Sequence, residues 1–309
     1  MRRAVPIALA LFISLSLCGC AGFKRSLFDQ YISLERWRSS MVPRTIQVND
    51  LSVSYLERDG GGETIVLLHG FSAEKDNWVR FVKHLPPRYR VIAIDLPGHG
   101  MTTRNWKTTY SIDYITQGFA NTVDALKLER FHLAGNSMGG FVSTLYGASH
   151  PDRVLSILLM NPSGTKSPEK SDREIAIEHG INPLVPKTMD GFESMLEYVF
   201  HKQPDMPWPA RSELASRYLR KSAFSEKVWS DIQESKVDTA LYLKDLHMPV
   251  LIMWGDRDRI IHVSTVHVFQ KGIPQAQTVI FKDCGHLPML ELPIESAQAY
   301  SSFLMGLRK

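Results

Sequence analysis

The pattern of hydrophobic and polar residues changes character along the chain. Residues 46–48 and 51–55 alternate apolar and polar side chains, which predicts two antiparallel strands with one wet face, joined at Asn49-Asp50. Later runs are almost wholly apolar, at residues 65–68, 91–94, 131–134, 154–160, 250–254 and 279–281. Continuous apolar strands separated by helical stretches are typical of a parallel sheet covered on both faces. We therefore expect one large α/β domain.

A glycine-framed serine lies between one of these strands and a helix. Residues 135–139 read Gly-Asn-Ser-Met-Gly, and a helical pattern opens at Phe141. Strand, sharp turn and helix is the setting in which G-x-S-x-G holds its serine clear of the sheet as a nucleophile. The next amide, that of Met138, then lies at a helix N-terminus, which favours an anion. Taken alone, so short a pattern is equally compatible with a chance glycine-serine turn.

Two later loops carry groups that could activate Ser137. Asp256 and Asp258 follow the apolar run 250–254, where a carboxylate can orient a histidine. His286 follows the last apolar run, and its imidazole could take the serine proton and return it to the leaving group. Residue types alone leave the choice between the two aspartates open. The order serine, acid, histidine is that of the α/β-hydrolases and differs from the large serine-protease families.

The loop after residues 65–68 is the expected source of a second oxyanion donor. A tetrahedral intermediate carries a negative oxygen that needs two preorganised donors, and Met138 N–H would be the first. Gly70 permits close approach, and we expect Phe71 N–H to be the second. His69 is a possible catalytic base, but the preferred interpretation is that it buttresses the loop, because His286 is better placed.

The segment Asp95-Leu96-Pro97-Gly98-His99-Gly100 closes the strand at residues 91–94. Asp95 precedes the serine, which is the wrong order for the catalytic acid of this arrangement. Asp95 and His99 are therefore interpreted as structural. Cys284 lies close to His286, and we interpret it as a small packed residue rather than a second nucleophile.

These motifs resemble those of the α/β-hydrolase superfamily from about Val48 to the C-terminus, and in particular those of monoacylglycerol lipases and cold-adapted bacterial lipases. The resemblance is carried by His69-Gly70-Phe71-Ser72, residues 95–100, residues 135–140, Trp254-Gly255-Asp256-Arg257-Asp258 and Cys284-Gly285-His286. It implies an α/β-hydrolase fold: a mostly parallel eight-stranded sheet, helices on both faces and an inserted helical cap. In those relatives the acid is the third residue after the glycine. The implied triad is Ser137, Asp258 and His286, with Asp256 as a turn residue.

The strand pattern stops between the two halves of the predicted core. Seven prolines and short amphipathic stretches fill the gap, which is too long for a loop in a compact domain. We predict a helical cap over residues 162–246, inserted between core segments 45–161 and 247–309. Apolar cap residues could line an acyl-chain pocket or could only hold the cap on the core, and both interpretations stay open. These residues are Met189, Phe192, Met195, Leu196 and Phe200.

Residues 1–20 are predicted to be a lipoprotein signal peptide. Two arginines precede an apolar stretch at residues 5–17, shorter than the roughly 20 residues of a membrane span. Residues 17–20, Leu-Cys-Gly-Cys, resemble the lipobox of bacterial lipoproteins. This resemblance implies cleavage before Cys20 and its lipidation, which anchors the protein in the cell envelope, with the outer membrane favoured in a Gram-negative cell. Cleavage nearby, or an uncleaved anchor, are the alternatives.

Residues 21–44 form a predicted amphipathic linker or arm. Its basic and aromatic residues suit a helix that either packs on its own domain, the preferred interpretation, or lies on a membrane surface. The net charge of +4 is mild, and no basic run interleaved with aromatics is present, so we expect no nucleic-acid partner. After cleavage only Cys20 and Cys284 remain, and with Cys20 lipidated no internal disulfide can form. Oligomeric state stays open.

The expected function is carboxylic-ester hydrolysis by a lipase or esterase. The substrate would be a small-molecule lipid ester such as an acylglycerol, cleaved through an acyl-Ser137 intermediate with no metal and no cofactor. A carbon–carbon bond hydrolase of the meta-cleavage type uses the same triad and is one alternative. A non-catalytic envelope lipoprotein is another. Haloalkane dehalogenases and epoxide hydrolases need a carboxylate nucleophile, which a serine at position 137 excludes.

Overall fold

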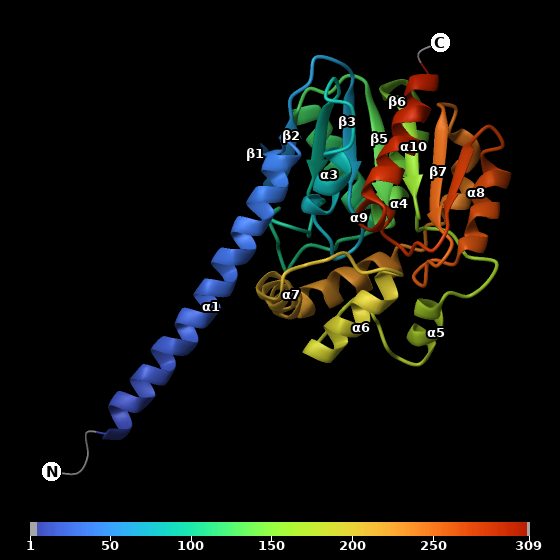
Figure 1. The fold of residues 1–309 in the computed structure, drawn as a ribbon. Helices are drawn as coiled ribbons and strands as arrows, with labels where there is room; N and C mark the ends of the chain where they lie inside the picture. Colours follow the sequence, from blue (N-terminus) through green and yellow to red (C-terminus); the bar gives the residue numbers. More distant parts are fainter. Residues whose placement is uncertain (1–4, 308–309) are drawn as a thin grey trace.

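The computed structural model describes residues 5–307, with side chains from Gly22 onward, and is built around one eight-stranded sheet (Figure 1). The strands are β1 (Val42–Val48), β2 (Leu51–Arg58), β3 (Thr64–Leu68), β4 (Arg90–Ile94), β5 (Phe131–Asn136), β6 (Val154–Met160), β7 (Val250–Gly255) and β8 (Gln277–Phe281). Their order is β1-β2-β4-β3-β5-β6-β7-β8. Strand β2 is antiparallel to both of its neighbours, and all other pairs are parallel. The predicted hairpin and the mostly parallel sheet are confirmed.

Helices cover both faces of this sheet, as the continuous apolar strands predicted. The helices are α1 (Val5–Arg38), α2 (Val79–Val82), α3 (Ile112–Ala125), α4 (Met138–Ser149), α5 (Asp172–Glu178), α6 (Met189–Val199), α7 (Trp208–Glu234), α8 (Val266–Gly272), α9 (Pro288–Glu291) and α10 (Pro293–Gly306). Alternate residues of the strands point to opposite faces and form two apolar clusters. One cluster packs under α3, α4 and α8, and the other under α2, α9 and α10.

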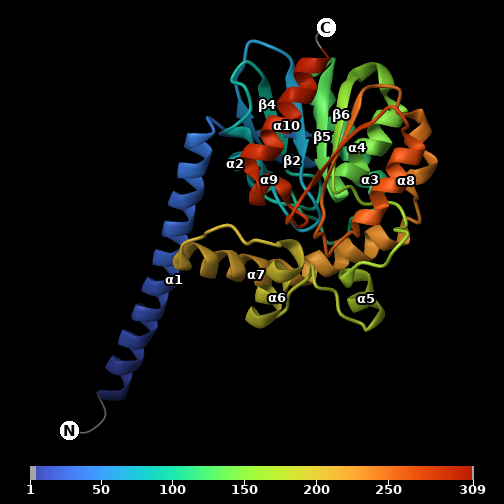
Figure 2. The ribbon, with the colours of Figure 1, turned by 45° about the vertical axis from the view of Figure 1, so that its right-hand side comes forward.

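Helices α5, α6 and α7 lie in the segment where a cap was predicted, between the end of β6 and the start of β7. They lie together across one end of the sheet (Figure 2). Helix α6 has a small core of its own with α7, formed by Phe192, Met195, Leu196 and Ala215. Because this core is separate from the two sheet clusters, the space between cap and sheet remains available for a cavity.

The N-terminal region is one long helix followed by the first strand. One helix, α1, runs from residue 5 to residue 38, extends beyond the domain, and is followed by β1 at Val42 (Figure 1). The strand begins earlier than the predicted core boundary at residue 45. The polar side chain of Arg44 interrupts the apolar pattern, so the sequence did not indicate that the strand starts at Val42. The backbone of Arg44 pairs with Tyr55 of β2, which extends the strand to that residue.

Two predictions for this region fall wholly or partly outside the described part of the chain. Residues 1–4 of the predicted signal peptide and the side chain of Cys20 lie outside it. In the part that the structure describes, no helix combines the length and the apolar character needed to cross a membrane. Further along α1, Phe28 is buried, whereas Phe23 and Trp37 are exposed. One face of the arm therefore packs on the protein itself.

A bidentate ion pair fixes the end of α1 to the core. Arg36 Nε donates to Asp76 Oδ1 at 2.6 Å, and Arg36 Nη2 donates to Asp76 Oδ2 at 2.7 Å. Asp76 is buried in the 3₁₀ helix η1 (Lys75–Trp78), and its hydrogen bond raises the pKa of Arg36. A second ion pair, between Glu35 and Arg80 of α2 at 3.4 Å, supports the same contact. The arm is thus attached beside the loop that follows β3.

We predict that Arg36→Met lowers the free energy of unfolding by about 1–3 kcal/mol, because it leaves the buried Asp76 carboxylate without its bidentate donor. Urea denaturation followed by circular dichroism measures the change. Arg38→Met is the matched control, since Arg38 is exposed and pairs only with Glu35. An exposed pair of this kind contributes less than about 1 kcal/mol. Equal effects of the two substitutions would contradict the assignment.

Candidate active site

Ser137 stands on a strained turn between β5 and α4. Its φ of 54° and ψ of −118° place a non-glycine residue in a backbone region that L-residues rarely adopt. A Cβ on Gly135 would lie 2.2 Å from the Gly139 carbonyl oxygen, and one on Gly139 would lie 2.3 Å from the Leu68 carbonyl oxygen. Both positions therefore require glycine. The surrounding backbone packs so closely that Ser137 is kept in its unfavourable backbone conformation.

The loop after β3 lies against this turn. A Cβ on Gly70 would approach the Ser137 Cβ to 3.1 Å, so the glycine allows the two segments to touch. Among the residues that the structure describes, the backbone N–H groups of Phe71 and Met138 have no acceptor. Met138 is the first residue of α4, where such free N–H groups and the helix dipole favour an anion. Both predicted oxyanion donors thus belong to segments that meet at Ser137.

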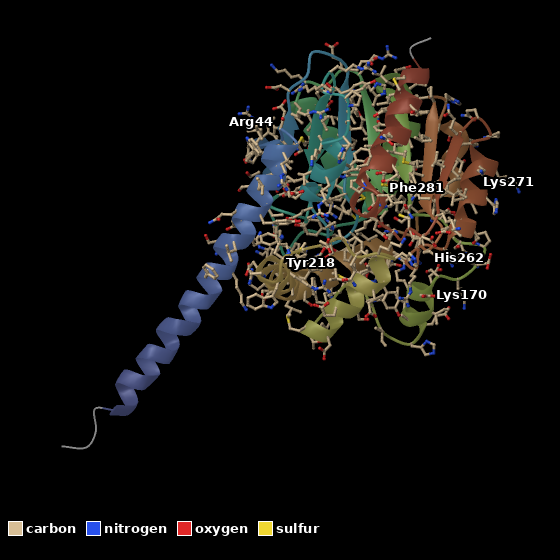
Figure 3. The ribbon with its side chains drawn as sticks, viewed as in Figure 1. Arg44, Lys170, Tyr218, His262, Lys271 and Phe281 are labelled. Atoms are coloured by element: carbon tan, nitrogen blue, oxygen red, sulfur yellow. The ribbon has the colours of Figure 1, made fainter. Side chains whose placement is uncertain are left out.

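The loops after β7 and β8 bring Asp258 and His286 together. Phe281, which is labelled in Figure 3, marks the end of β8 and the start of the loop that carries His286. His286 Nδ1 lies 2.8 Å from Asp258 Oδ2. The other oxygen, Oδ1, accepts from Ile260 N–H at 2.8 Å and Ile261 N–H at 3.0 Å, and Asn161 Nδ2 donates to Oδ2 at 2.7 Å. Four donors fix this carboxylate. This contact favours the imidazole tautomer with its proton on Nδ1, which leaves Nε2 unprotonated and able to accept a proton.

Asp256, the other candidate acid, lies at the turn instead. Its Oδ1 accepts from the backbone N–H of Cys284 at 3.4 Å, and its Oδ2 lies 3.8 Å from Arg257 Nε. It has no contact with the ring of His286 among the described hydrogen bonds. Cys284 is fully buried, and burial raises the pKa of its thiol, which leaves it a packed and unreactive residue.

Ser137 and His286 line the same cavity. The elbow and the histidine loop are also joined directly, because Asn136 Nδ2 donates to the His286 carbonyl at 3.1 Å. In the described part of the chain, Ser137 Oγ forms no hydrogen bond with the His286 ring. Such bonds are commonly long without substrate and tighten when it binds. Ser137, Asp258 and His286 therefore all follow the ends of parallel strands, β5, β7 and β8, at one edge of the sheet.

The two earlier histidines are buried and neutral. Burial lowers the pKa of His69 to about 3 and that of His99 to about 3. His69 Nδ1 donates to the Gly70 carbonyl at 2.7 Å, and its Nε2 accepts from Leu96 N–H at 3.1 Å. This is the buttressing contact expected of His69. A histidine whose ring nitrogens are both bonded to backbone cannot act as the base.

Asp95 is also structural, with a partner that the sequence did not reveal. Its Oδ2 accepts from Lys75 Nζ at 2.7 Å, and both side chains are almost completely buried. Its oxygens also accept the backbone N–H groups of Lys75 and Met101. This buried pair ties the loop after β4 to η1, immediately beyond the loop that carries Phe71.

Glu291 joins the cap to the histidine loop, a role that no motif indicated. Its carboxylate accepts three backbone N–H groups, from Gly285 at 2.9 Å, Lys202 at 2.8 Å and His201 at 3.1 Å. His286 N–H in turn donates to the Val199 carbonyl at 2.9 Å. Burial raises the pKa of Glu291 to about 7, although the three donors act in the opposite direction. The end of α6 and the loop that carries His286 are therefore held as one unit.

A cavity of about 990 Å³ opens beside Ser137 between the sheet, the cap and α1. Met195, Leu196 and Phe200 line it, as one reading of the cap residues predicted. The prediction is wrong for Met189, which is 45% exposed, and for Phe192, which is buried in the small core of the cap. Both belong to α6, but their positions around the helix turn them away from the cavity.

Helix α1 supplies part of the cavity wall, which sequence reasoning missed. Phe28, Tyr31 and Ile32 line it opposite the residues of the cap. Their amphipathic spacing indicated a buried helix face but did not say what that face would contact. Close contact of α1 with α7, including an ion pair between Asp29 and Arg217 at 2.6 Å, decides this.

Comparison with known proteins gives the family. A model described as the alpha/beta hydrolase fold matches residues 63–293. This chain belongs to the α/β-hydrolase fold family. Lipase 3 of Moraxella sp. (strain TA144) is 31% identical over 98% of both chains. Monoacylglycerol lipase ABHD6 of Bos taurus is 32% identical over 81% of this chain and 78% of its own. With these relatives, the protein is an enzyme of the serine ester hydrolase type.

Solved structures agree with this family. A crystal structure of a membrane phospholipase A, described as a bacterial virulence factor, is 36% identical and has a TM-score of 0.91 over 98% of both chains. A meta-cleavage product hydrolase from Pseudomonas fluorescens is 24% identical, with a TM-score of 0.71 over 85% of this chain and 97% of its own. At that level of identity the likeness concerns the fold alone.

We predict that Glu291→Gln lowers kcat about 10-fold or more and changes KM little, because the amide places N–H donors against backbone N–H groups and loosens the loop that carries His286. Steady-state kinetics on a p-nitrophenyl ester separates the two constants. Glu295→Gln, an exposed carboxyl on α10, is the matched control. A pure rise in KM, or an equal effect of the control, would contradict the role.

Proposed function

We propose that this protein is a carboxylic-ester hydrolase in which Ser137 is the nucleophile, His286 the general base and Asp258 the acid that orients it. The observation that carries the proposal is the 2.8 Å contact between His286 Nδ1 and Asp258 Oδ2, beside a cavity that Ser137 also lines. The N–H groups of Phe71 and Met138 form the proposed oxyanion hole. No step of this reaction requires a metal or a cofactor.

The reaction has two stages. His286 Nε2 takes the Ser137 proton as Oγ attacks the carbonyl carbon, and the carbonyl oxygen becomes an anion that the two N–H groups stabilise. The C–O bond to the alcohol then breaks, and the imidazolium returns its proton to the departing alkoxide. Water repeats the sequence on the acyl-Ser137 ester and releases the carboxylic acid. Asp258 stabilises the imidazolium in both stages.

The proposed substrates are acylglycerols or similar lipid esters. The cavity beside Ser137 is large enough for an acyl chain, and Met195, Leu196 and Phe200 give it an apolar wall. The names of the relatives, two lipases and a phospholipase, support the same class of substrate. Attachment to the cell envelope through a lipidated Cys20 would place the enzyme at a lipid surface and is part of the proposal. Carbon–carbon bond hydrolysis has support from fold alone.

We predict that the purified protein hydrolyses p-nitrophenyl acyl esters and monoacylglycerols and that Ser137→Ala lowers kcat by at least about 10³-fold. A series of acyl chain lengths, measured on both proteins, tests site and substrate class together. A fluorophosphonate probe should label the wild type and not the variant. Labelling without ester hydrolysis, combined with cleavage of a ring-fission diketone, would favour the carbon–carbon hydrolase instead. Absence of both labelling and turnover would favour a non-catalytic lipoprotein.

The two neighbouring aspartates allow a matched test of the acid. We predict that Asp258→Asn lowers kcat about 10³- to 10⁴-fold, because an amide holds the imidazole in the wrong tautomer. Asp256→Asn should reduce kcat less than about 10-fold, since the Asp256 side chain contacts Cys284 N–H and Arg257 and not the ring of His286. Kinetics on one p-nitrophenyl ester compares them directly. A larger loss for Asp256→Asn would reverse the assignment.

A further inference from the structure

Glu74 is an acidic side chain that lines the cavity beside Ser137. The proposed mechanism does not use it. It follows the loop that carries Phe71 and lines the same cavity as Ser137. It precedes η1, and its side chain makes no capping hydrogen bond to that helix. Burial and the carboxylates of Asp76 and Asp95 raise its pKa.

The neighbouring charged groups are already engaged with other partners. Lys75 is bonded to Asp95, and Asp76 is bonded to Arg36. Among the residues that the structure describes, no donor or cation lies within bonding distance of the Glu74 carboxylate. Glu74 is half-buried and faces the cavity, so its carboxylate is open to a ligand that donates hydrogen bonds.

Lys221 of α7 lines the same cavity. Its Nζ donates to the Ser72 carbonyl and lies 4.0 Å from the centre of the Tyr218 ring, which is labelled in Figure 3. No ion pair joins it to a carboxylate in the described part of the chain. Burial lowers its pKa to about 8, and Glu74 acts in the opposite direction, so the ammonium stays largely protonated at neutral pH. Two of its three N–H bonds remain to be satisfied.

The Glu74 carboxylate is a hydrogen-bond acceptor and the Lys221 ammonium is a donor, and the two line one cavity without bonding to each other. They therefore match a ligand that can both donate and accept hydrogen bonds. A hydroxyl group donates to a carboxylate and accepts from an ammonium. Arginines line other parts of the cavity, among them Arg104 and Arg220. Beside Glu74 itself, an anionic head group would be repelled, and a quaternary ammonium offers the carboxylate no N–H or O–H donor. The neutral hydroxyl groups of a polyol therefore fit best.

We propose that Glu74 and Lys221 form a subsite for the free hydroxyl groups of the glycerol moiety in the ester substrate. Glu74 accepts a hydrogen bond from one hydroxyl, and Lys221 donates to a hydroxyl of the same moiety. The subsite rests on the proposed function, because it binds the alcohol part of an ester whose acyl group is transferred to Ser137. It would make a partial glyceride a better substrate than a simple alkyl ester of the same acid.

The test compares two esters of one fatty acid, 1-monooctanoylglycerol and methyl octanoate, each below its critical micelle concentration. We expect Glu74→Leu to lower kcat/KM for the glycerol ester about 10- to 100-fold, the range for loss of a hydrogen bond to a charged group. The kcat/KM for methyl octanoate should change less than about threefold. Lys221→Met should shift the ratio of the two constants in the same direction, and the isosteric Glu74→Gln should give a smaller shift.

Glu226→Leu is the matched control, because Glu226 is a half-exposed carboxyl on α7 that pairs with Lys187. Activity on methyl octanoate shows that each variant is folded, and Glu74→Gln keeps the test available where Glu74→Leu does not fold. An unchanged ratio, or equal losses on both esters, overturns the subsite while the ester hydrolase stands. If the wild type hydrolyses neither ester, the proposed function fails and the subsite fails with it.

Discussion

The structure depends on the close packing of backbone around the turn at Ser137. Neither Gly135 nor Gly139 has room for a side chain, because the carbonyl groups of α4 and β3 occupy that space. A residue at positive φ is unfavourable by about 1–3 kcal/mol and persists only where its surroundings leave no alternative. The same contacts press the β3 loop against the helix N-terminus. One packing constraint thus positions the serine and both neighbouring N–H groups.

Around this turn, the loops are held by carboxylates that accept backbone N–H groups. Asp258 accepts from residues 260 and 261, Asp95 from residues 75 and 101, and Glu291 from residues 201, 202 and 285. A loop offers many unpaired N–H groups, and a carboxylate can satisfy several at once. Such contacts give irregular segments the rigidity that a strand or helix obtains from its own ladder. Asp258 also accepts a hydrogen bond from the His286 imidazole at 2.8 Å, whereas Asp95 lies 4.0 Å from the ring of His69.

The cavity belongs to three separate parts of the chain. The sheet loops supply Ser137 and His286, the cap supplies apolar side chains, and α1 supplies the opposite wall. Ion pairs attach α1 to the core through Asp76 and to the cap through Arg217. The site therefore combines the polar groups of the sheet loops with a chamber that apolar and charged side chains of the cap and α1 line. Glu74 and Lys221 also line this chamber, and neither forms an ion pair with the residues that the structure describes.

The sequence alone determined the features that depend on local pattern. Apolar periodicity predicted the sheet and its hairpin, and glycines beside strand ends marked the loops of Ser137, Asp258 and His286, because a tight turn restricts residue choice within a few positions. Three features could be known only from the tertiary structure. They are the contacts of Glu291, the part of the cavity wall that α1 supplies, and the directions in which Met189 and Phe192 point. They join segments far apart in the chain or depend on how a helix is rotated against its neighbours. An amphipathic pattern says that a face is buried, and only packing decides against what.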